Sequence, residues 1–166
     1  MAKSTLDGKR VLAVDDEPDV LATLKEEILE AAPKCKFETA TTSQEATKKI
    51  ESQVYDVVIL DIMGVDGFNL LESAVKRNFR VAMLTAHALN VDALNRSFKM
   101  RAMAYLPKEK LGEIVPFLED ILKYEYLPSW RRLMEKSKRF FDSKFEPDWE
   151  KKTDLPWEEW GKYFWA

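Results

Sequence analysis

Cysteine is almost absent from the sequence, and long apolar runs are missing altogether. Cys35 is the only cysteine among 166 residues, so the chain can form neither an internal disulfide nor a thiolate metal cage. The longest aliphatic run, Val57–Leu60, is far too short to cross a bilayer, and the N-terminal segment lacks the apolar stretch of a secretory signal. We therefore expect a cytoplasmic protein that is neither exported nor inserted into a membrane.

An excess of basic charge is also lacking. The 26 Lys and Arg residues face 29 Asp and Glu residues, a net charge of −3 that provides no overall basic field for a nucleic acid. Hydrophobic residues make up 46% of the chain and charged residues 33%, as in ordinary globular proteins. A chain of 166 residues is long enough for one domain and some additional sequence. We expect a packed fold and no nucleic-acid partner.

Short apolar runs alternate with helical patterns as far as residue 125. The run Val11–Val14 is followed by Pro18, which suits a first helical turn, and then by apolar residues at helical spacing up to Pro33. The pairing repeats, with strands predicted at 36–40, 56–60, 80–84 and 102–106, and helices at 43–52 (capped by Ser43), 68–76, 91–99 and 111–124. This alternation predicts a doubly wound α/β domain, a five-stranded parallel sheet with helices on both faces.

Residues 126–166 have a different character and contain all five tryptophans. One face of a predicted helix carries Trp130, Leu133, Met134, Ser137 and Phe141. Such an apolar face packs on its own domain, mediates self-association or docks a downstream partner, and the sequence leaves these alternatives open. Balanced charge and the lack of a helix-turn-helix pattern argue against a DNA-binding output domain. We divide the chain into a domain at 1–125 and a helical C-terminal extension at 126–166.

Polar residues follow the ends of the predicted strands. Asp15 and Asp16 follow the first strand, Asp61 the third, Thr85 the fourth and Lys108 the fifth. The carboxyl ends of parallel strands lie at one edge of a sheet, so these side chains are expected to share a site. Clustered carboxylates repel one another unless a cation intervenes, and Mg²⁺ binds carboxylates while it keeps waters and accepts phosphate oxygens. The pattern predicts a Mg²⁺ site.

An aspartate at such a site can act as a nucleophile. Its carboxylate forms an acyl phosphate when a metal and a cation neutralise the charge of the transferred phosphoryl group. Asp61 is the predicted nucleophile, and Asp15 and Asp16 would hold the metal. Lys108 would pair with the carboxylate or with the phosphoryl oxygens. The Thr85 hydroxyl would donate to the new phosphate, beside which the small Ala86 leaves space.

Four segments carry these residues in order and at ordinary spacing. They are Val14-Asp15-Asp16-Glu17-Pro18, Asp56-Val57-Val58-Ile59-Leu60-Asp61-Ile62-Met63, Leu84-Thr85-Ala86 and Tyr105-Leu106-Pro107-Lys108. Taken together, they resemble the receiver domain of two-component response regulators, over about residues 9–124. The resemblance implies a flavodoxin-like fold with strand order 2-1-3-4-5.

The resemblance also implies a function in phosphorelay signalling. A sensor histidine kinase or phosphotransfer protein would donate a phosphoryl group from phosphohistidine to Asp61 in a Mg²⁺-dependent step, and this would switch protein contacts. The family's pattern implies that the backbone carbonyl of Met63 completes the metal site. It also implies that the ring of Tyr105 swings inward when Thr85 moves to the phosphate. The C-terminal extension would then contribute to homodimerisation or to docking of a downstream protein.

The sequence departs from the family's usual pattern at two places. The loop after Asp61 runs from Met63 directly into Gly64-Val65-Asp66-Gly67, two residues shorter than usual. The shorter loop affects the direction in which the Met63 carbonyl points. The usual Lys-Pro dipeptide is replaced by Pro107-Lys108, so the proline cannot supply a cis bond after the lysine.

Two other functions stay open at this stage. A scaffold of receiver fold would bind its partner without phosphorylation. A phosphatase of the haloacid-dehalogenase type would use the same nucleophile, but it needs a second aspartate where Met63 stands. Tyr105 is as typical of a plain core aromatic as of a moving switch. His87, the only histidine, is assigned no catalytic role.

Overall fold

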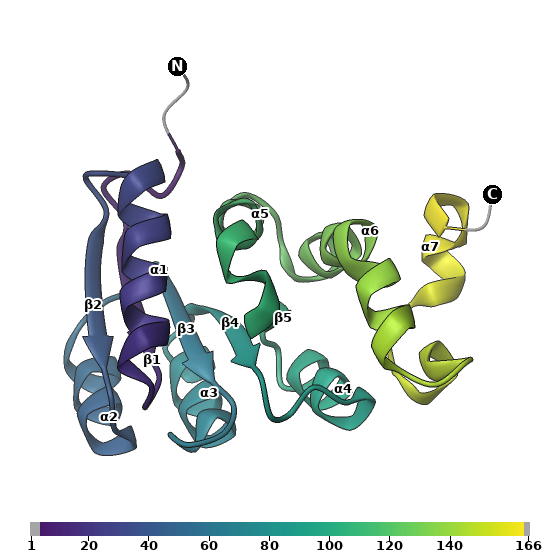
Figure 1. The fold of residues 1–166 in the computed structure, drawn as a ribbon, viewed down its shortest axis with the longest axis horizontal. Coiled ribbons are helices and arrows are strands. Elements are labelled where there is room, and N and C mark those ends of the chain that lie inside the picture. The colour runs from purple at the N-terminus through teal and green to yellow at the C-terminus, as the bar shows by residue number, and fades with distance from the viewer. Residues whose placement is uncertain (1–3, 165–166) are drawn as a thin grey trace.

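The computed structural model describes residues 4–164 and contains one parallel sheet (Figure 1). Its strand order is β2-β1-β3-β4-β5, with neighbouring strands parallel. The strands are β1 (Arg10–Val14), β2 (Lys36–Ala40), β3 (Val57–Asp61), β4 (Arg80–Thr85) and β5 (Ala104–Pro107). The predicted fold class and strand order are therefore confirmed.

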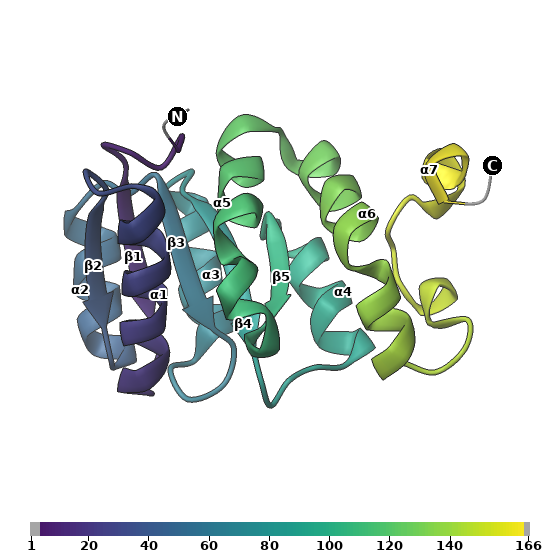
Figure 2. The same cartoon turned by 45° about the horizontal axis from the view of Figure 1, so that its top comes forward.

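Helices cover both faces of the sheet. On one face α1 (Pro18–Ala31) packs beside α5 (Ile114–Lys123), and on the other α2 (Ser43–Ser52) packs beside α3 (Gly67–Lys76) (Figures 1 and 2). The fourth helix, α4 (Val91–Lys99), contacts β5. The apolar strands β1, β3 and β4 are almost wholly buried because helices cover them from both sides.

Several element ends differ from the predictions by one residue, and three further differences concern a cap or a larger shift. Thr42 rather than Ser43 caps α2, because Thr42 has the extended backbone that a cap requires and its Oγ1 accepts from the Glu45 backbone N–H at 3.1 Å. The helix predicted over 111–124 begins only at Ile114. A 3-10 helix, η1 (Lys108–Glu113), precedes it, and Lys110 within η1 departs from helical dihedrals. The strand predicted over 102–106 begins at Ala104 instead, after a left-handed residue at Arg101.

The C-terminal extension is helical and lies against the sheet domain. It consists of α6 (Tyr126–Lys144), the 3-10 helix η2 (Trp149–Lys152) and α7 (Trp157–Phe164). In both views α6 lies beside β5 and α5, and η2 contacts α4 (Figures 1 and 2). Trp165 and Ala166, which the prediction included, fall outside the described residues. Within residues 4–164, no helix has the length and apolarity needed to span a membrane.

The apolar face predicted on α6 packs on the chain itself. All five of its members are buried: Trp130, Leu133, Met134, Ser137 and Phe141. Trp130 also donates its indole N–H to the Ala102 carbonyl at 2.7 Å, which ties α6 to the segment that leads into β5. The structure therefore uses this face for intramolecular packing, one of the alternatives that the sequence left open.

Candidate functional site

Three aspartates meet at the carboxyl edge of the sheet. Asp15 and Asp16 follow β1 directly, and Asp61 is the last residue of the neighbouring strand β3. One carboxylate oxygen from each residue lies within 4.8 Å of the other two. Asp15 and Asp61 are buried, whereas Asp16 is exposed at the rim. The alternation of strands and helices thus brings together the three carboxylates that the sequence predicted.

Lys108 supplies the positive charge of this cluster. It directly follows β5, and its Nζ lies 2.9 Å from Asp15 Oδ2 and 3.4 Å from Asp61 Oδ1. The side chain is only 9% exposed. Burial lowers the pKa of Lys108, but the ion pair with Asp15 and the negative charge of Asp61 outweigh burial, so the pKa is raised. Lys108 is therefore held in its charged form between the two buried carboxylates.

Asp61 is the carboxylate whose ionisation is most strongly opposed. Burial, together with the negative charge of Asp15, raises the pKa of Asp61 to about 6, and Lys108 offsets only part of this increase. One lysine therefore does not neutralise the cluster. An additional cation would stabilise the ionised form of Asp61.

The oxygen atoms of the cluster fit a hard divalent cation. Asp15 Oδ1 accepts from the Glu17 backbone N–H at 2.9 Å, which orients the carboxylate. Asp15 Oδ2 is buried and, apart from its ion pair with Lys108, has no hydrogen-bond partner within residues 4–164. A buried carboxylate oxygen whose one close partner among the described residues is the Lys108 ammonium, beside two further carboxylates, matches the oxygen ligands that Mg²⁺ takes in proteins.

The short loop after Asp61 packs tightly against the acidic cluster. Gly64 has φ +87°, and a Cβ atom at this position would lie 2.7 Å from Asp16 Oδ2. A Cβ atom at Gly67 would lie 2.2 Å from the Asp61 carbonyl oxygen. Met63 lies in the same loop and its side chain is exposed. The two glycines therefore allow this loop to approach the carboxylates closely.

The hydroxyls of Thr85 and Tyr105 are linked through the loop that follows β4. Thr85 is buried and follows Leu84, which pairs with Asp61 in the sheet. Its Oγ1 accepts from the Ala88 backbone N–H at 2.7 Å. Tyr105 is fully buried, and its hydroxyl donates to the Ala88 carbonyl at 2.6 Å and accepts from the Asn90 backbone N–H at 3.1 Å. Its ring therefore points inward in this structure.

The remaining residues near the site are exposed or were not anticipated. Ala86 and His87 are exposed in the loop after β4. The sequence interpretation missed Glu17, whose Oε1 lies 3.5 Å from Lys108 Nζ, and it missed the packing role of Gly64. The acidic triplet Asp15-Asp16-Glu17 and the scarcity of glycine, five in the whole chain, were the available signals.

The fold is that of a doubly wound α/β protein, and three aspartates and a lysine form a site at the carboxyl edge of its sheet. A model of the response regulator receiver domain family matches residues 11–118. Because the match covers more than half of the chain, the protein belongs to the response regulator receiver domain family. Receiver domains are signalling modules of two-component systems.

The curated relatives include plant proteins that are much longer than this chain. The two-component response regulator ARR18 of Arabidopsis thaliana is 37% identical over 108 residues, which cover 61% of this chain and 16% of that protein. The two-component response regulator ORR21 of Oryza sativa subsp. indica is 35% identical over 128 residues, covering 72% of this chain and 18% of that protein. The chain therefore spans less than a fifth of the length of either relative.

Solved structures show the same similarity. The receiver domain of Francisella response regulator 1452 is 25% identical and superposes with a TM-score of 0.61, covering 69% of this chain and 97% of that one. A CheY-like response regulator receiver domain protein from Methanospirillum hungatei is 28% identical with a TM-score of 0.54, covering 87% and 98% of the two chains.

Proposed function

We propose that the protein is a phosphoryl acceptor in a two-component phosphorelay, with Asp61 as the acceptor. The observation that carries the proposal is the position of Asp61, which lies buried between a second carboxylate, Asp15, and the ammonium group of Lys108. The donor is a phosphohistidine of a sensor histidine kinase or phosphotransfer protein. Family membership supports this donor class.

The chemistry follows from the groups at the strand ends. An oxygen of the ionised Asp61 attacks the phosphorus, one O–P bond forms, and the P–N bond of the donor breaks with its electron pair returning to the imidazole. Lys108 lies close enough to Asp61 to pair with the oxygens of the incoming group. The Thr85 hydroxyl is assigned as a donor to the new phosphate, and the small side chain of Ala86 leaves room for it.

The metal site is assigned to four residues. Asp15, Asp16 and Asp61 offer carboxylate oxygens that lie close together, and the Met63 backbone carbonyl is the fourth proposed ligand. When bound, Mg²⁺ neutralises the charge that the transferred phosphoryl group brings. Asp15 is already oriented by the Glu17 N–H, and Asp16 is positioned by contact with Gly64.

The same proposal assigns different roles to the two parts of the chain. Residues 1–125 form the receiver domain, and residues 126–166 form an extension that influences contacts with a second copy or a downstream protein. The cytoplasmic location expected from the sequence also belongs to this proposal. The protein acts as a switch that catalyses only its own phosphorylation and dephosphorylation.

Labelling by a small phosphodonor tests the acceptor assignment. Incubation with acetyl phosphate and Mg²⁺ should add one phosphoryl group, detected by intact-protein mass spectrometry and lost in Asp61→Asn because the amide is not a nucleophile. Asp66→Asn is the matched control, because Asp66 is exposed in the same loop and carries no assigned role. Undiminished labelling of Asp61→Asn would refute the assignment.

A further inference from the structure

The phosphate-binding side of the site reaches the C-terminal extension through a continuous chain of contacts. The Thr85 hydroxyl is bonded to the Ala88 N–H, and the Ala88 carbonyl accepts from the Tyr105 hydroxyl. The ring of Tyr105 lies 6.0 Å, centroid to centroid, from the ring of Phe141 on α6. Tyr105 and Phe141 are both fully buried, so neither ring can shift without displacing the other.

A second route leads from the site lysine to the same turns of α6. The two residues after Lys108 contact the extension: Glu109 Oε1 lies 3.6 Å from Lys144 Nζ, and Lys110 Nζ lies 5.4 Å from the centroid of the Phe140 ring. Lys144 Nζ is also 5.5 Å from that centroid. Residues 109 and 110, which follow Lys108, and Tyr105, which is linked to Thr85 through Ala88, therefore contact residues 140–144 of α6.

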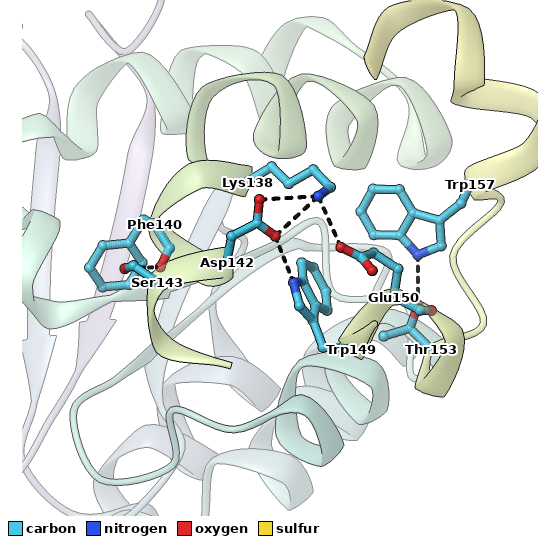
Figure 3. Close-up of polar contacts among 8 residues, drawn as sticks. All are labelled: Lys138, Phe140, Asp142, Ser143, Trp149, Glu150, Thr153 and Trp157. Carbon is cyan, nitrogen blue, oxygen red and sulfur yellow. Dashed lines mark hydrogen bonds and ion pairs between the residues drawn. The ribbon is translucent and has the colours of Figure 1, made fainter. Parts of the chain in front are cut away.

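Phe141 also packs against other aromatic residues of the extension. Its ring stacks on Phe145 with centroids 5.5 Å apart, and Trp149 lies edge-on at 6.1 Å. The Trp149 indole N–H donates to Asp142 at 2.8 Å, and Lys138 bridges Asp142 and Glu150 (Figure 3). A displacement of Phe141 is therefore transmitted to η2 rather than absorbed by a loose side chain.

We propose that the C-terminal extension is an intramolecular regulatory element whose docking is coupled to occupancy of the Asp61 site through the contact of Phe141 with Tyr105. The inference rests on the proposed function, whose site it extends. The docked extension holds Tyr105 inward, and Tyr105 in turn holds residues 88–90 and the Thr85 hydroxyl. The extension therefore pre-organises the phosphate site, and an occupied site strengthens docking by the same factor.

The distribution of tryptophan provides a direct readout. All five tryptophans lie in residues 126–166, so intrinsic tryptophan fluorescence reports on the extension and, through Trp130, on its contact with Phe98 and Ala102 of the sheet domain. Titration of the full chain with beryllofluoride, a phosphoryl mimic, in Mg²⁺ should give a saturable change in this emission. Bound beryllofluoride is measured independently by ¹⁹F NMR. Asp61→Asn should abolish both signals.

A pair of variants within one aromatic cluster tests the route. Phe141→Leu should weaken beryllofluoride binding about five-fold or more, the lower end of ordinary allosteric coupling. Phe145→Leu is the graded comparison, because Phe145 supports Phe141 but makes no ring contact with Tyr105 within the described chain, so its effect should be the smaller one. It should change the affinity less than about two-fold, a small fraction of such coupling.

The outcomes separate this inference from the proposed function. A bound ¹⁹F signal in the unaltered protein with unchanged tryptophan emission would overturn the coupling and leave the acceptor role intact. Equal affinities of Phe141→Leu and the unaltered protein would overturn it too. No bound ¹⁹F signal in the unaltered protein would instead contradict the proposed function. The fluorescence titration requires no substitution in the extension, so it decides the matter even if Phe141→Leu does not fold.

Discussion

The strand-end site and the C-terminal extension both bring charged groups together, but their charge balance differs. At the site, Asp15, Asp16 and Asp61 face one cation of the described chain, Lys108. In and around α6, by contrast, Asp120 pairs with Arg132 and Lys136. There, Lys138 pairs with Asp142 and Glu150.

The contrast separates a binding site from structural ion pairs. In these two clusters three cations match three carboxylates, one of which, Asp120, belongs to α5, so the chain supplies the counter-ions itself. At the strand ends three carboxylates lie close to one lysine, and burial together with the negative charge of Asp15 raises the pKa of Asp61. An incomplete charge balance in a partly buried carboxylate cluster is the kind of environment that supports the proposed Mg²⁺ site.

The largest expected effect concerns how strongly the buried face of α6 anchors the extension to the sheet domain. Trp130→Ala removes a fully buried ring and its hydrogen bond to Ala102, so the free energy of unfolding should fall by about 3–5 kcal/mol. Urea denaturation followed by far-UV circular dichroism measures this. Leu127→Ala, on the same helix but 41% exposed, should cost less than about 1 kcal/mol. Similar losses for the two variants would show that α6 is not anchored by its buried face.

The second-largest expected effect concerns the pH dependence of stability that the buried carboxylate of Asp61 causes. The folded-state pKa of Asp61, about 6, lies above its ordinary value of 3.8. The folded protein thus binds the proton more tightly, and stability is lost as the pH rises from about 4 to about 6. In EDTA, Asp61→Asn should remove this loss and stabilise the protein by about 1–2 kcal/mol at neutral pH, because the amide carries no charge.

Denaturation at about pH 4 and at about pH 7.5 brackets this window and measures the difference. Asp66→Asn serves as the control and should keep the pH dependence of the unaltered protein. If Asp61→Asn is less stable than the unaltered protein at both pH values, Lys108 alone balances the cluster and the contrast drawn above fails.

The smallest effect concerns the loop against Asp16. Gly64→Ala places a Cβ atom against the Asp16 carboxylate on a backbone with φ +87°, so it should cost about 1–2 kcal/mol and weaken Mg²⁺ binding measured by calorimetry. Gly112→Ala is the matched substitution, because a Cβ atom at Gly112 would meet open space. It should lose neither stability nor Mg²⁺ affinity. Unchanged Mg²⁺ affinity in Gly64→Ala would show that Asp16 does not depend on this loop.

The sheet and its acidic edge were accessible from the sequence for a simple reason. Strict alternation of strand and helix makes a sheet parallel, and a parallel sheet gathers its strand ends at one edge. Asp15, Asp61 and Lys108 could therefore be placed together although they are distant in sequence. The family match supports the same interpretation over residues 11–118.

Other features depend on tertiary packing that local patterns do not encode. The inward position of Tyr105 is set by hydrogen bonds to residues 88 and 90 and by Phe141, which no spacing rule connects. The packing partner of the α6 face was open for the same reason, because an apolar stripe does not specify what covers it. The 3-10 helix at Lys108–Glu113 stands where a helical turn was predicted from residue 111, and the non-helical dihedrals of Lys110 interrupt the regular helix there.

The position of α6 also bears on how this sheet avoids joining another one. Outer strands normally expose unpaired backbone groups that invite intermolecular strand addition and aggregation. The outer strand β2 carries Lys36 and Glu38, and Arg10 and Lys49 pair with Glu38. The opposite outer strand, β5, has no charged residue and is buried along its whole length beside α6. Together with α4, α6 thus covers β5, and removal of the extension would uncover part of an uncharged outer strand, the kind of edge that invites strand addition.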